Sequence, residues 1–307
     1  MAFEKLVLVT RKTRLQGLIE RFNSKGQARF YIEHAGGDFA DYESEDAAYR
    51  QALDTVRRSL EFGLKVQVLE RSLVPTCLFT EHDVIVTLGQ DGLVANTAKY
   101  VGEQPIVAVN PDPVRFDGVL LPFLPDAARR TVARVLEGGA RFRAITMAEA
   151  VLDDGQRLLG FNDLFIGSAS HVSARYRISH AGATVPHSSS GVLVCTGAGS
   201  TGWLSSVFNM AGAVGELTGG QTGRPLKLEW EDSRLVFVVR EPFASKHSAV
   251  DLAAGVLSEG EDLILESLMP SGGVVFSDGV EADYLAFNSG AVARVHAARQ
   301  RARLAVP

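Results

Sequence analysis

The chain has 307 residues, 46% of them hydrophobic and 22% charged, which is typical of a globular protein with a sizeable core. Its formal charge of −5 provides no overall basic field to attract nucleic acid or an anionic membrane surface. Cys77 and Cys195 are its two cysteines, which excludes a disulfide framework or a Cys-x-x-Cys metal site and favours the cytoplasm. No apolar run approaches the roughly 18 residues of a membrane span, and the first ten residues are too short an apolar run for a signal peptide.

The first 140 residues alternate between strand-like and helix-like segments. Short apolar runs predict strands at Lys5–Thr10, Leu64–Leu69, Val84–Leu88 and Pro105–Val109. Helices are predicted at Thr13–Phe22, Ser44–Glu61 (with Ser44 as N-cap), Val94–Val101 and Asp126–Leu136, while Asn23–Ser44 gives mixed signals. Such alternation predicts a buried parallel sheet with helices on both faces, and ligands bind these sheets at the carboxyl ends of the strands.

After residue 140 the pattern changes to short strands separated by turns rich in Gly and Ser. The predicted strands are Phe142–Val151, Asp163–Gly167, Ala174–His180, Gly191–Thr196, Leu226–Trp230, Leu235–Arg240, Asp262–Glu266, Gly273–Ser277 and Ala291–Ala297, and only Trp203–Val214 has helical spacing. The sequence therefore predicts an α/β protein: an N-terminal parallel-sheet domain over residues 1–140, then a β-rich, mostly antiparallel domain over 141–307.

The predicted strand Val84–Leu88 ends in a turn of small residues, Gly89-Gln90-Asp91-Gly92, which carries one acid. Glycines allow the backbone to approach a phosphate closely, and a following helix presents unpaired N–H groups to it. A carboxylate held there can accept a proton from an attacking hydroxyl. Asp91 alone also fits a turn or a helix cap, but its place at the mouth of a parallel sheet favours the catalytic interpretation.

A second glycine-rich loop, Thr196–Trp203, contains the pattern Gly-x-Gly-x-x-Gly after an apolar strand. In dinucleotide-binding proteins that pattern opens a βαβ unit, whereas here it lies in mid-chain and strands follow. A structural turn is a second interpretation, and a ligand-contacting loop of another fold is the one we favour. No Gly-Lys-Ser or Gly-Lys-Thr occurs, so the chain is not a P-loop enzyme.

Asn162 and Asp163 directly precede the apolar segment Leu164-Phe165-Ile166. Such a pair commonly forms a turn. As ligand groups, the carboxylate would accept from ribose hydroxyls and the amide would both donate to and accept from an adenine edge. With two glycine-rich loops in one chain, this favours a phosphotransferase that handles nucleotides.

Taken together, these segments resemble the NAD kinase family. That family carries a Gly-Gly-Asp-Gly-Thr loop, an Asn-Glu pair and a Thr-x-Thr-Gly-Ser-Thr-Ala-Tyr loop, in this order. The matching segments here are Gly89–Leu93, Asn162-Asp163 and Thr196–Trp203, and a late Asp278-Gly279 turn also fits. Asn162–Gly167, the segment 109–113 and Ser189-Ser190-Gly191 look closer to the mitochondrial branch.

The resemblance implies that the first domain binds the nucleotide donor and the second binds the acceptor. The implied reaction transfers the γ-phosphoryl group of ATP, with Mg²⁺, to the 2′-hydroxyl of the adenosine ribose of NAD(H). Asp91 would be the catalytic base, and Gly89, Gln90 and Gly92 would contact the donor phosphates. The residues implied to contact the acceptor are Asn162, Asp163, Thr196, Ser200, Thr201, Gly202 and Trp203. The same resemblance implies a homodimer or a higher homo-oligomer, and no residues are assigned to a protein-held metal.

Several positions depart from the family pattern. Gln90 replaces a glycine of the phosphate loop, Leu93 replaces its threonine, Asp163 is shorter than glutamate, and Ser190 stands where the common branch has an acid. These departures leave open a protein that binds NAD(P)(H) or nucleotide without catalysis. They also leave open a kinase for a sugar, nucleoside or lipid, although the polar Asn162-Asp163 pair argues against a lipid.

Overall fold

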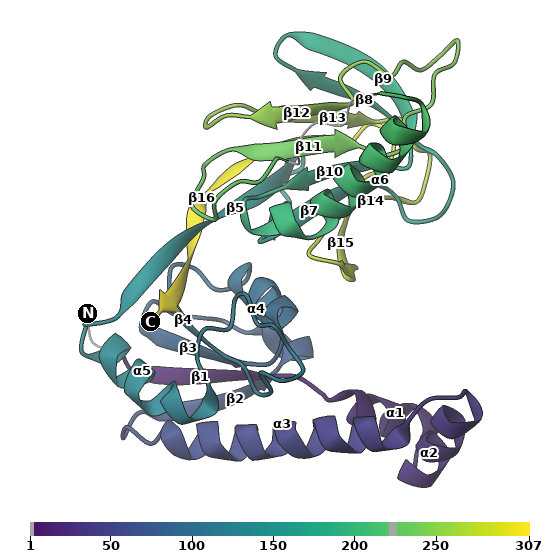
Figure 1. Ribbon diagram of the computed structural model, residues 1–307. Coiled ribbons are helices and arrows are strands. Elements are labelled where there is room, and N and C mark those ends of the chain that lie inside the picture. Colours follow the sequence, from purple (N-terminus) through teal and green to yellow (C-terminus); the bar gives the residue numbers. More distant parts are fainter. Residues whose placement is uncertain (1–2, 221–225) are drawn as a thin grey trace. The chain divides into compact units, whose positions relative to one another are not determined.

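The computed structural model describes residues 3–220 and 226–307, and it divides the chain into two compact units (Figure 1). Unit 1 comprises Met1–Arg143 and Arg303–Pro307, and unit 2 comprises Ala144–Ala302. The predicted α/β class, with a parallel sheet followed by antiparallel sheets, is confirmed. Within the described part of the chain, no helix is both long and apolar enough to cross a membrane.

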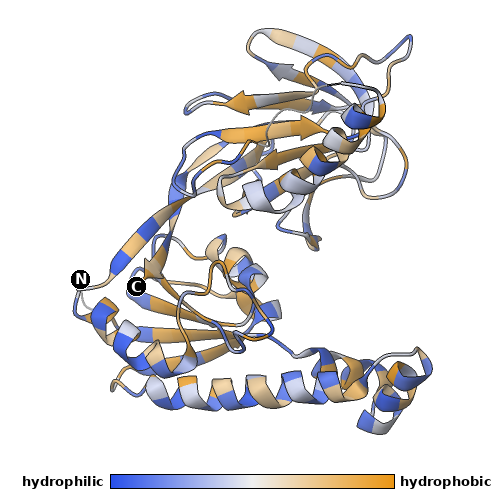
Figure 2. Cartoon of the chain, viewed as in Figure 1, coloured by the Kyte–Doolittle hydropathy of each residue, from blue (hydrophilic) through white to orange (hydrophobic). Residues whose placement is uncertain are grey.

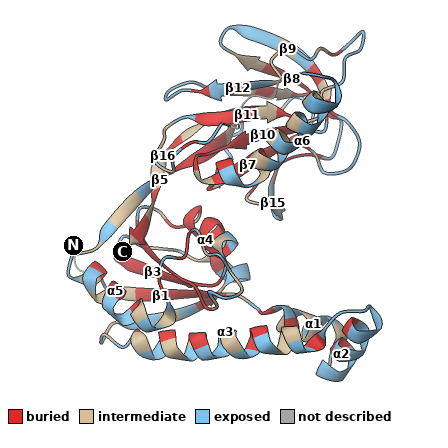
Figure 3. Cartoon of the chain, viewed as in Figure 1, coloured by how far each residue is buried: buried red, intermediate tan, exposed pale blue. Residues whose placement is uncertain are grey.

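Unit 1 is built on a parallel sheet in the order β2-β1-β3-β4, to which the end of β16 adds beside β4. The strands are β1 (Lys5–Thr10), β2 (Lys65–Glu70), β3 (Asp83–Leu88), β4 (Pro105–Val109) and β16 (Val292–Val306). All six residues of β3 and all five of β4 are buried, because helices cover both faces of the sheet. Figure 3 shows β3 in the colour of buried residues.

The helices of unit 1 are α1 (Arg14–Phe22), α2 (Lys25–His34), α3 (Phe39–Ser59), α4 (Asp91–Ala98) and α5 (Ala128–Leu136), with the short 3₁₀ turns η1 (Arg71–Thr76) and η2 (Pro125–Ala127). Helices α3 and α5 bury an apolar cluster against one face of the sheet. Helix α4 and η1 contact the strands from the opposite face. Hydrophobic residues are concentrated in the strands, whereas α3 alternates polar and apolar residues along its length (Figure 2).

The helices of unit 1 differ from the predictions in several places. The segment with mixed signals contains α2, whose N-cap Ser24 accepts a hydrogen bond from the Gln27 backbone. Helix α3 begins at Phe39 rather than Ser44, because Asp38 caps it by accepting from the Ala40 N–H. Helix α4 begins at Asp91, so its first turn includes residues that were predicted to lie in the preceding loop.

Unit 2 is a pair of facing sheets made of antiparallel strand pairs. One sheet has the order β12-β11-β10-β7-β14-β15, and the other joins β13, β8, β9, β5 and β6 to the first part of β16. Its strands are β5 (Arg141–Leu152), β6 (Arg157–Gly160), β7 (Asp163–Ser168), β8 (Ala174–His180), β9 (Ala183–Ser189), β10 (Val192–Cys195), β11 (Leu235–Val239), β12 (Ala254–Leu257), β13 (Leu263–Ser267), β14 (Gly273–Ser277) and β15 (Val280–Ala286). The 3₁₀ turn η3 (Ala198–Thr201) and helix α6 (Trp203–Leu217) follow β10.

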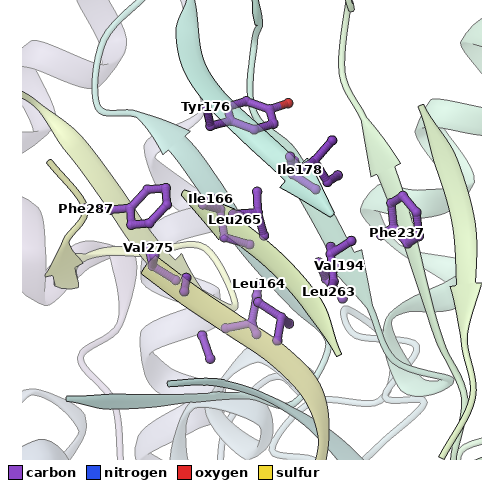
Figure 4. Close-up of a cluster of buried hydrophobic side chains, with 14 of the residues drawn as sticks. Leu164, Ile166, Tyr176, Ile178, Val194, Phe237, Leu263, Leu265, Val275 and Phe287 are labelled. Atoms are coloured by element: carbon purple, nitrogen blue, oxygen red, sulfur yellow. The ribbon is translucent and has the colours of Figure 1, made fainter. Parts of the chain in front are cut away.

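The core of unit 2 lies between the two sheets. Alternate residues of each strand point inward, among them Leu164, Ile166 and Phe237 from one sheet and Tyr176 and Leu265 from the other (Figure 4). Helix α6 covers part of the outer face of the first sheet through Leu204, which packs with residues of β10 and β11.

The predicted strand Leu226–Trp230 is wrong. Residues 226–229 have no regular structure and Trp230 lies in a turn, although Leu228 is buried beneath α6. The segment is apolar because Leu228 is buried, not because it forms a strand. The Trp230 carbonyl accepts a hydrogen bond from the Thr146 N–H, but no β-ladder forms. Strands β6, β9, β12 and β15 were not predicted, because their sequences are short, polar or interrupted by Pro186.

Candidate active site

In unit 1 the candidate donor loop lies at the carboxyl end of β3. Gly89 is buried, Gln90 is exposed, and Asp91 is the first residue of α4 and half-buried. A Cβ at Gly89 would lie 2.7 Å from the Leu93 Cδ2 atom, so a larger residue there would require the Leu93 side chain to shift. Gly92, by contrast, has open space around it.

The Asp91 carboxylate is anchored by the loop that follows β4. Its Oδ1 atom accepts from the backbone N–H of Leu120 at 2.6 Å. This contact fixes the side chain and leaves the second carboxylate oxygen available to another donor. The Asp91 carboxylate therefore has a fixed orientation at the start of α4.

The first turn of α4 presents backbone N–H groups that a helix cannot pair internally. The N-cap residue Gln90 makes no side-chain capping hydrogen bond within the described chain. Its backbone carbonyl accepts from the Leu93 N–H at 2.8 Å, which closes the turn. Since the positive end of the helix dipole also points at this turn, the loop can receive an anion such as phosphate.

In unit 2 a second cluster forms where β7 begins and β10 ends. The Thr196 hydroxyl donates to the Phe161 carbonyl at 2.6 Å and lies 3.2 Å from the Asn162 carbonyl. The Ser200 hydroxyl donates to the Gly197 carbonyl at 2.7 Å. These two hydroxyls shape the loop: the Thr196 oxygen also accepts from the Gly199 N–H at 3.2 Å, and both residues are buried.

The Gly-x-Gly-x-x-Gly pattern of this loop has a packing role. A Cβ at Gly197 would lie 1.8 Å from the Glu229 carbonyl oxygen, and a Cβ at Gly199 would lie 2.0 Å from that of Asn162. Both glycines are needed because another backbone segment approaches at these points. The strand before this loop, β10, pairs antiparallel with both β7 and β11, so the pattern lies outside a βαβ unit; its contact with a ligand stays a prediction.

Asp278 holds the Asn162-Asp163 segment from the opposite side. Its carboxylate accepts from three successive backbone N–H groups: Phe161 at 3.0 Å, Asn162 at 2.6 Å and Asp163 at 3.4 Å. The Asp278 N–H in turn donates to the Asp163 carbonyl at 3.1 Å. The late Asp-Gly turn noted in the sequence is thus the anchor of the predicted acceptor pair.

Asp163 is buried and lies beside Cys195 in the register of β7 and β10. Burial raises the pKa of the Cys195 thiol well above its ordinary range, and the nearby Asp163 charge raises it further. A thiol with so high a pKa remains protonated at neutral pH and is not a nucleophile.

Thr201 and Gly202 are exposed at the start of α6, next to Trp203. The Trp203 ring stacks on Phe165 with a centroid separation of 5.8 Å, and the Arg240 guanidinium lies 5.1 Å from the Trp203 ring centre. These three side chains, with Phe276 and Tyr284, line a cavity of about 920 Å³ on unit 2. Flat aromatic faces beside one cation suit a planar ring that bears polar groups.

The two loops and the Asn162-Asp163 pair are evident from the sequence, but the aromatic cavity is not. Phe165 and Phe276 occupy alternate, outward-facing positions of β7 and β14, and Arg240 follows β11. Their contact depends on strand pairing between distant segments, of which the sequence carries no local signal.

Two solved structures have the same fold as this chain. Yeast NADH kinase, crystallised with NADH, matches with a TM-score of 0.59 and 16% identity, over 100% of this chain and 84% of that one. An NAD kinase from Archaeoglobus fulgidus, in complex with ATP, matches with a TM-score of 0.55 and 16% identity, over 97% of this chain and 92% of that one. No protein-family model and no curated protein sequence matches the chain. The NAD kinase fold implied by the sequence motifs is therefore confirmed.

Proposed function

We propose that this protein is an NAD kinase-like phosphotransferase, which transfers the γ-phosphoryl group of ATP to the 2′-hydroxyl of the adenosine ribose of NAD(H). The observation that carries the proposal is the anchored carboxylate of Asp91, at the carboxyl end of β3 and the first turn of α4, in a fold shared with two NAD kinases. Unit 1 would bind the donor and unit 2 the acceptor.

The donor phosphates would bind at the turn formed by Gly89, Gln90 and Gly92. The unpaired N–H groups of the first turn of α4 would donate to phosphate oxygens, and the exposed Gln90 amide can add one donor. In the described chain, no group of three or more His, Cys, Asp or Glu side chains could hold a metal ion. Mg²⁺ would arrive bound to the nucleotide phosphates, whose charge it offsets.

The acceptor would bind at the cluster anchored by Asp278. Asn162 and Asp163 would contact the ribose hydroxyls and the adenine edge, and Thr196 and Ser200 would maintain the loop geometry. Thr201, Gly202 and Trp203 are accessible beside the aromatic cavity, so the Trp203 ring can stack on a planar base.

Asp91 would act as the general base. One carboxylate oxygen of Asp91 would keep its hydrogen bond from the Leu120 N–H. The other carboxylate oxygen would take the proton of the 2′-hydroxyl while the hydroxyl oxygen attacks the γ-phosphorus of ATP. In phosphoryl transfer the protein takes little part in making or breaking covalent bonds, so most of the catalytic effect would come from positioning the two substrates.

The test is to incubate the purified full chain with Mg-ATP and either NAD or NADH and to measure NADP or NADPH. Asp91→Asn should lower turnover by about 10²–10⁴-fold while acceptor binding changes much less. Asp117→Asn, an exposed acid in the loop that anchors Asp91, is the matched control and should keep its activity. Full activity in Asp91→Asn, or tight NAD(H) binding with no transfer from ATP, other nucleoside triphosphates or polyphosphate, would contradict the proposal.

We also propose a homo-oligomer in the cytoplasm. Strands β12 and β15 end the six-stranded sheet of unit 2, and a two-fold partner could pair or cover such an edge. Both described cysteines are unpaired, as expected in a reducing compartment. A monomer in light scattering at micromolar concentration would contradict the oligomer.

A further inference from the structure

Arg11 lies beside the candidate donor loop of unit 1. Strands β1 and β3 pair in parallel with Val9 opposite Thr87, so the residue after β1 is level with the residue after β3. Those two residues are Arg11 and Gly89. Consistent with this register, a Cβ at Gly89 would lie 3.5 Å from the Arg11 Cδ atom. The aliphatic part of Arg11 therefore passes directly alongside the loop.

The Arg11 guanidinium is held between two aromatic rings. Its central carbon lies 5.3 Å from the Tyr49 ring centre and 5.6 Å from that of Phe116, distances at which a cation is attracted to the ring face. The Tyr49 hydroxyl accepts from the Arg11 N–H at 2.9 Å and donates to the Leu88 carbonyl at 3.1 Å. Tyr49 thereby links Leu88, which precedes Gly89, to the backbone of Arg11.

Only some of the N–H donors of the Arg11 guanidinium make hydrogen bonds. Its Nη2 atom donates to Glu45 at 2.9 Å and its Nη1 atom donates to the Lys12 carbonyl at 3.1 Å. The buried Nε–H has no hydrogen-bond partner among the described residues, and the side chain is 11% exposed. A charged donor left unsatisfied beside a loop is costly unless a ligand completes its hydrogen bonds.

Glu45 sets the direction of the guanidinium without fully neutralising it. The Glu45 carboxylate is shared, because the Arg14 Nε–H donates to its second oxygen. Arg14 and Arg115 are in turn linked through Asp41. Arg115 also pairs with Asp112, and the Glu45 charge is divided between Arg11 and Arg14, so Glu45 does not serve Arg11 alone.

We infer that Arg11 binds the phosphates of the donor, with Glu45, Tyr49 and Phe116 as the residues that position its guanidinium. The loop itself offers neutral N–H donors, whereas a polyphosphate needs a cation, and a guanidinium gives phosphate charge-assisted and bidentate hydrogen bonds. The inference rests on the proposed function for the identity of the donor, and it concerns binding of the donor alone.

The test is calorimetric titration of the full chain with Mg-ATP and, separately, with adenosine, which lacks phosphate. Arg11→Gln should weaken Mg-ATP binding about 10–100-fold, the value of a hydrogen bond to a charged group, and leave adenosine binding unchanged. Arg14→Gln is the matched control: it removes an arginine from the same Glu45, but its side chain is 44% exposed and points to Asp41, so Mg-ATP binding should stay within about 3-fold.

Two further measurements keep the inference testable if Arg11→Gln fails to fold. Arg11→Lys keeps the positive charge and the aliphatic part of the side chain but loses the planar guanidinium with its paired N–H donors. Its affinity for Mg-ATP should lie between those of the wild type and Arg11→Gln. In the ¹⁵N-labelled wild-type chain, the Arg11 Nε–H resonance should shift on addition of Mg-ATP and not on addition of adenosine.

The outcomes separate this inference from the proposed function. If the wild-type chain phosphorylates NAD but Arg11→Gln binds Mg-ATP as well as Arg14→Gln does, Arg11 is structural and the inference fails alone. If Mg-ATP binding depends on Arg11 but no acceptor is phosphorylated, the inference holds and the proposed function fails. A wild-type chain that binds neither Mg-ATP nor inorganic tripolyphosphate overturns both.

Discussion

Replacing Asp278 by Asn should loosen the acceptor cluster of unit 2, because that carboxylate uses both oxygens to hold one turn. Oδ2 accepts from the Phe161 N–H at 3.0 Å, and Oδ1 accepts from the Asn162 N–H at 2.6 Å. Asparagine has a single carbonyl oxygen, so its NH₂ group must face one of these N–H donors. The substitution thus removes the charge, loses the bond or bonds made by one of the two oxygens and places an NH₂ donor against a backbone N–H donor.

The magnitude follows from those contacts. A hydrogen bond to a charged group contributes about 1.5–3 kcal/mol, and an unsatisfied half-buried donor adds to the loss. Asp278→Asn should therefore lower the free energy of unfolding of unit 2 by about 2–4 kcal/mol. Backbone strain does not contribute, because the left-handed conformation of Asp278, with φ of 52°, is one that asparagine also adopts.

Thermal unfolding by differential scanning calorimetry measures the effect, with an expected fall in Tm of roughly 5–15 °C. Asp232→Asn is the control, since its carboxylate pairs only locally, with Arg234, and its loss should cost less than about 1 kcal/mol. The KM for NAD(H) should rise in Asp278→Asn alone, as the Asn162 turn loosens. Equal Tm values for the two variants would refute the reasoning that Asp278 is the anchor.

Three further changes test the loops and the charged network. Gln90→Gly should raise the KM for Mg-ATP about 2–10-fold, because an amide donor is lost; higher NAD phosphorylation in that variant would show instead that the side chain obstructs the donor. Gly199→Ala should destabilise unit 2 by about 3 kcal/mol in urea unfolding, because its Cβ would overlap the Asn162 carbonyl, whereas Gly17→Ala, in open space on α1, should be neutral or slightly stabilising. Burial raises the pKa of Glu45, but hydrogen bonds from two arginines and their charges outweigh this and hold it below the ordinary 4.5. Its contribution to stability is therefore present above that pH and lost as the pH falls, so the difference in unfolding free energy between wild type and Glu45→Gln should shrink below pH 4.5; a difference constant from pH 7 to 3 would contradict this.

The sequence alone determined the parallel sheet of unit 1 and the position of its acid. Strands β1, β3 and β4 are buried on both faces, so each is a short, mainly apolar run. The turn at Gly89–Gly92 then follows from small residues at the end of such a run. In unit 2 the burial of β8 alternates along the strand, because one face is buried, whereas β7 is an apolar segment covered on both faces.

The spacing of apolar residues in a sequence indicates which residues are buried, but it does not indicate which element covers them. The segment 226–230 was therefore predicted as a strand, although Leu228 is covered by α6 and has no strand partner. Likewise, the local pattern does not state that the end of β16 pairs with β4, because that pairing joins Arg303 to Pro105 across almost two hundred residues.

The same distinction separates the two halves of the candidate site. Asp91 was found from its own neighbours in the sequence, since the strand, the turn and the acid are contiguous. The anchoring of Asn162 by Asp278, the stacking of Trp203 on Phe165 and the place of Arg11 beside Gly89 each join segments from different strands. Only the tertiary structure decided these contacts, because strand order and register set them, and both result from long-range packing.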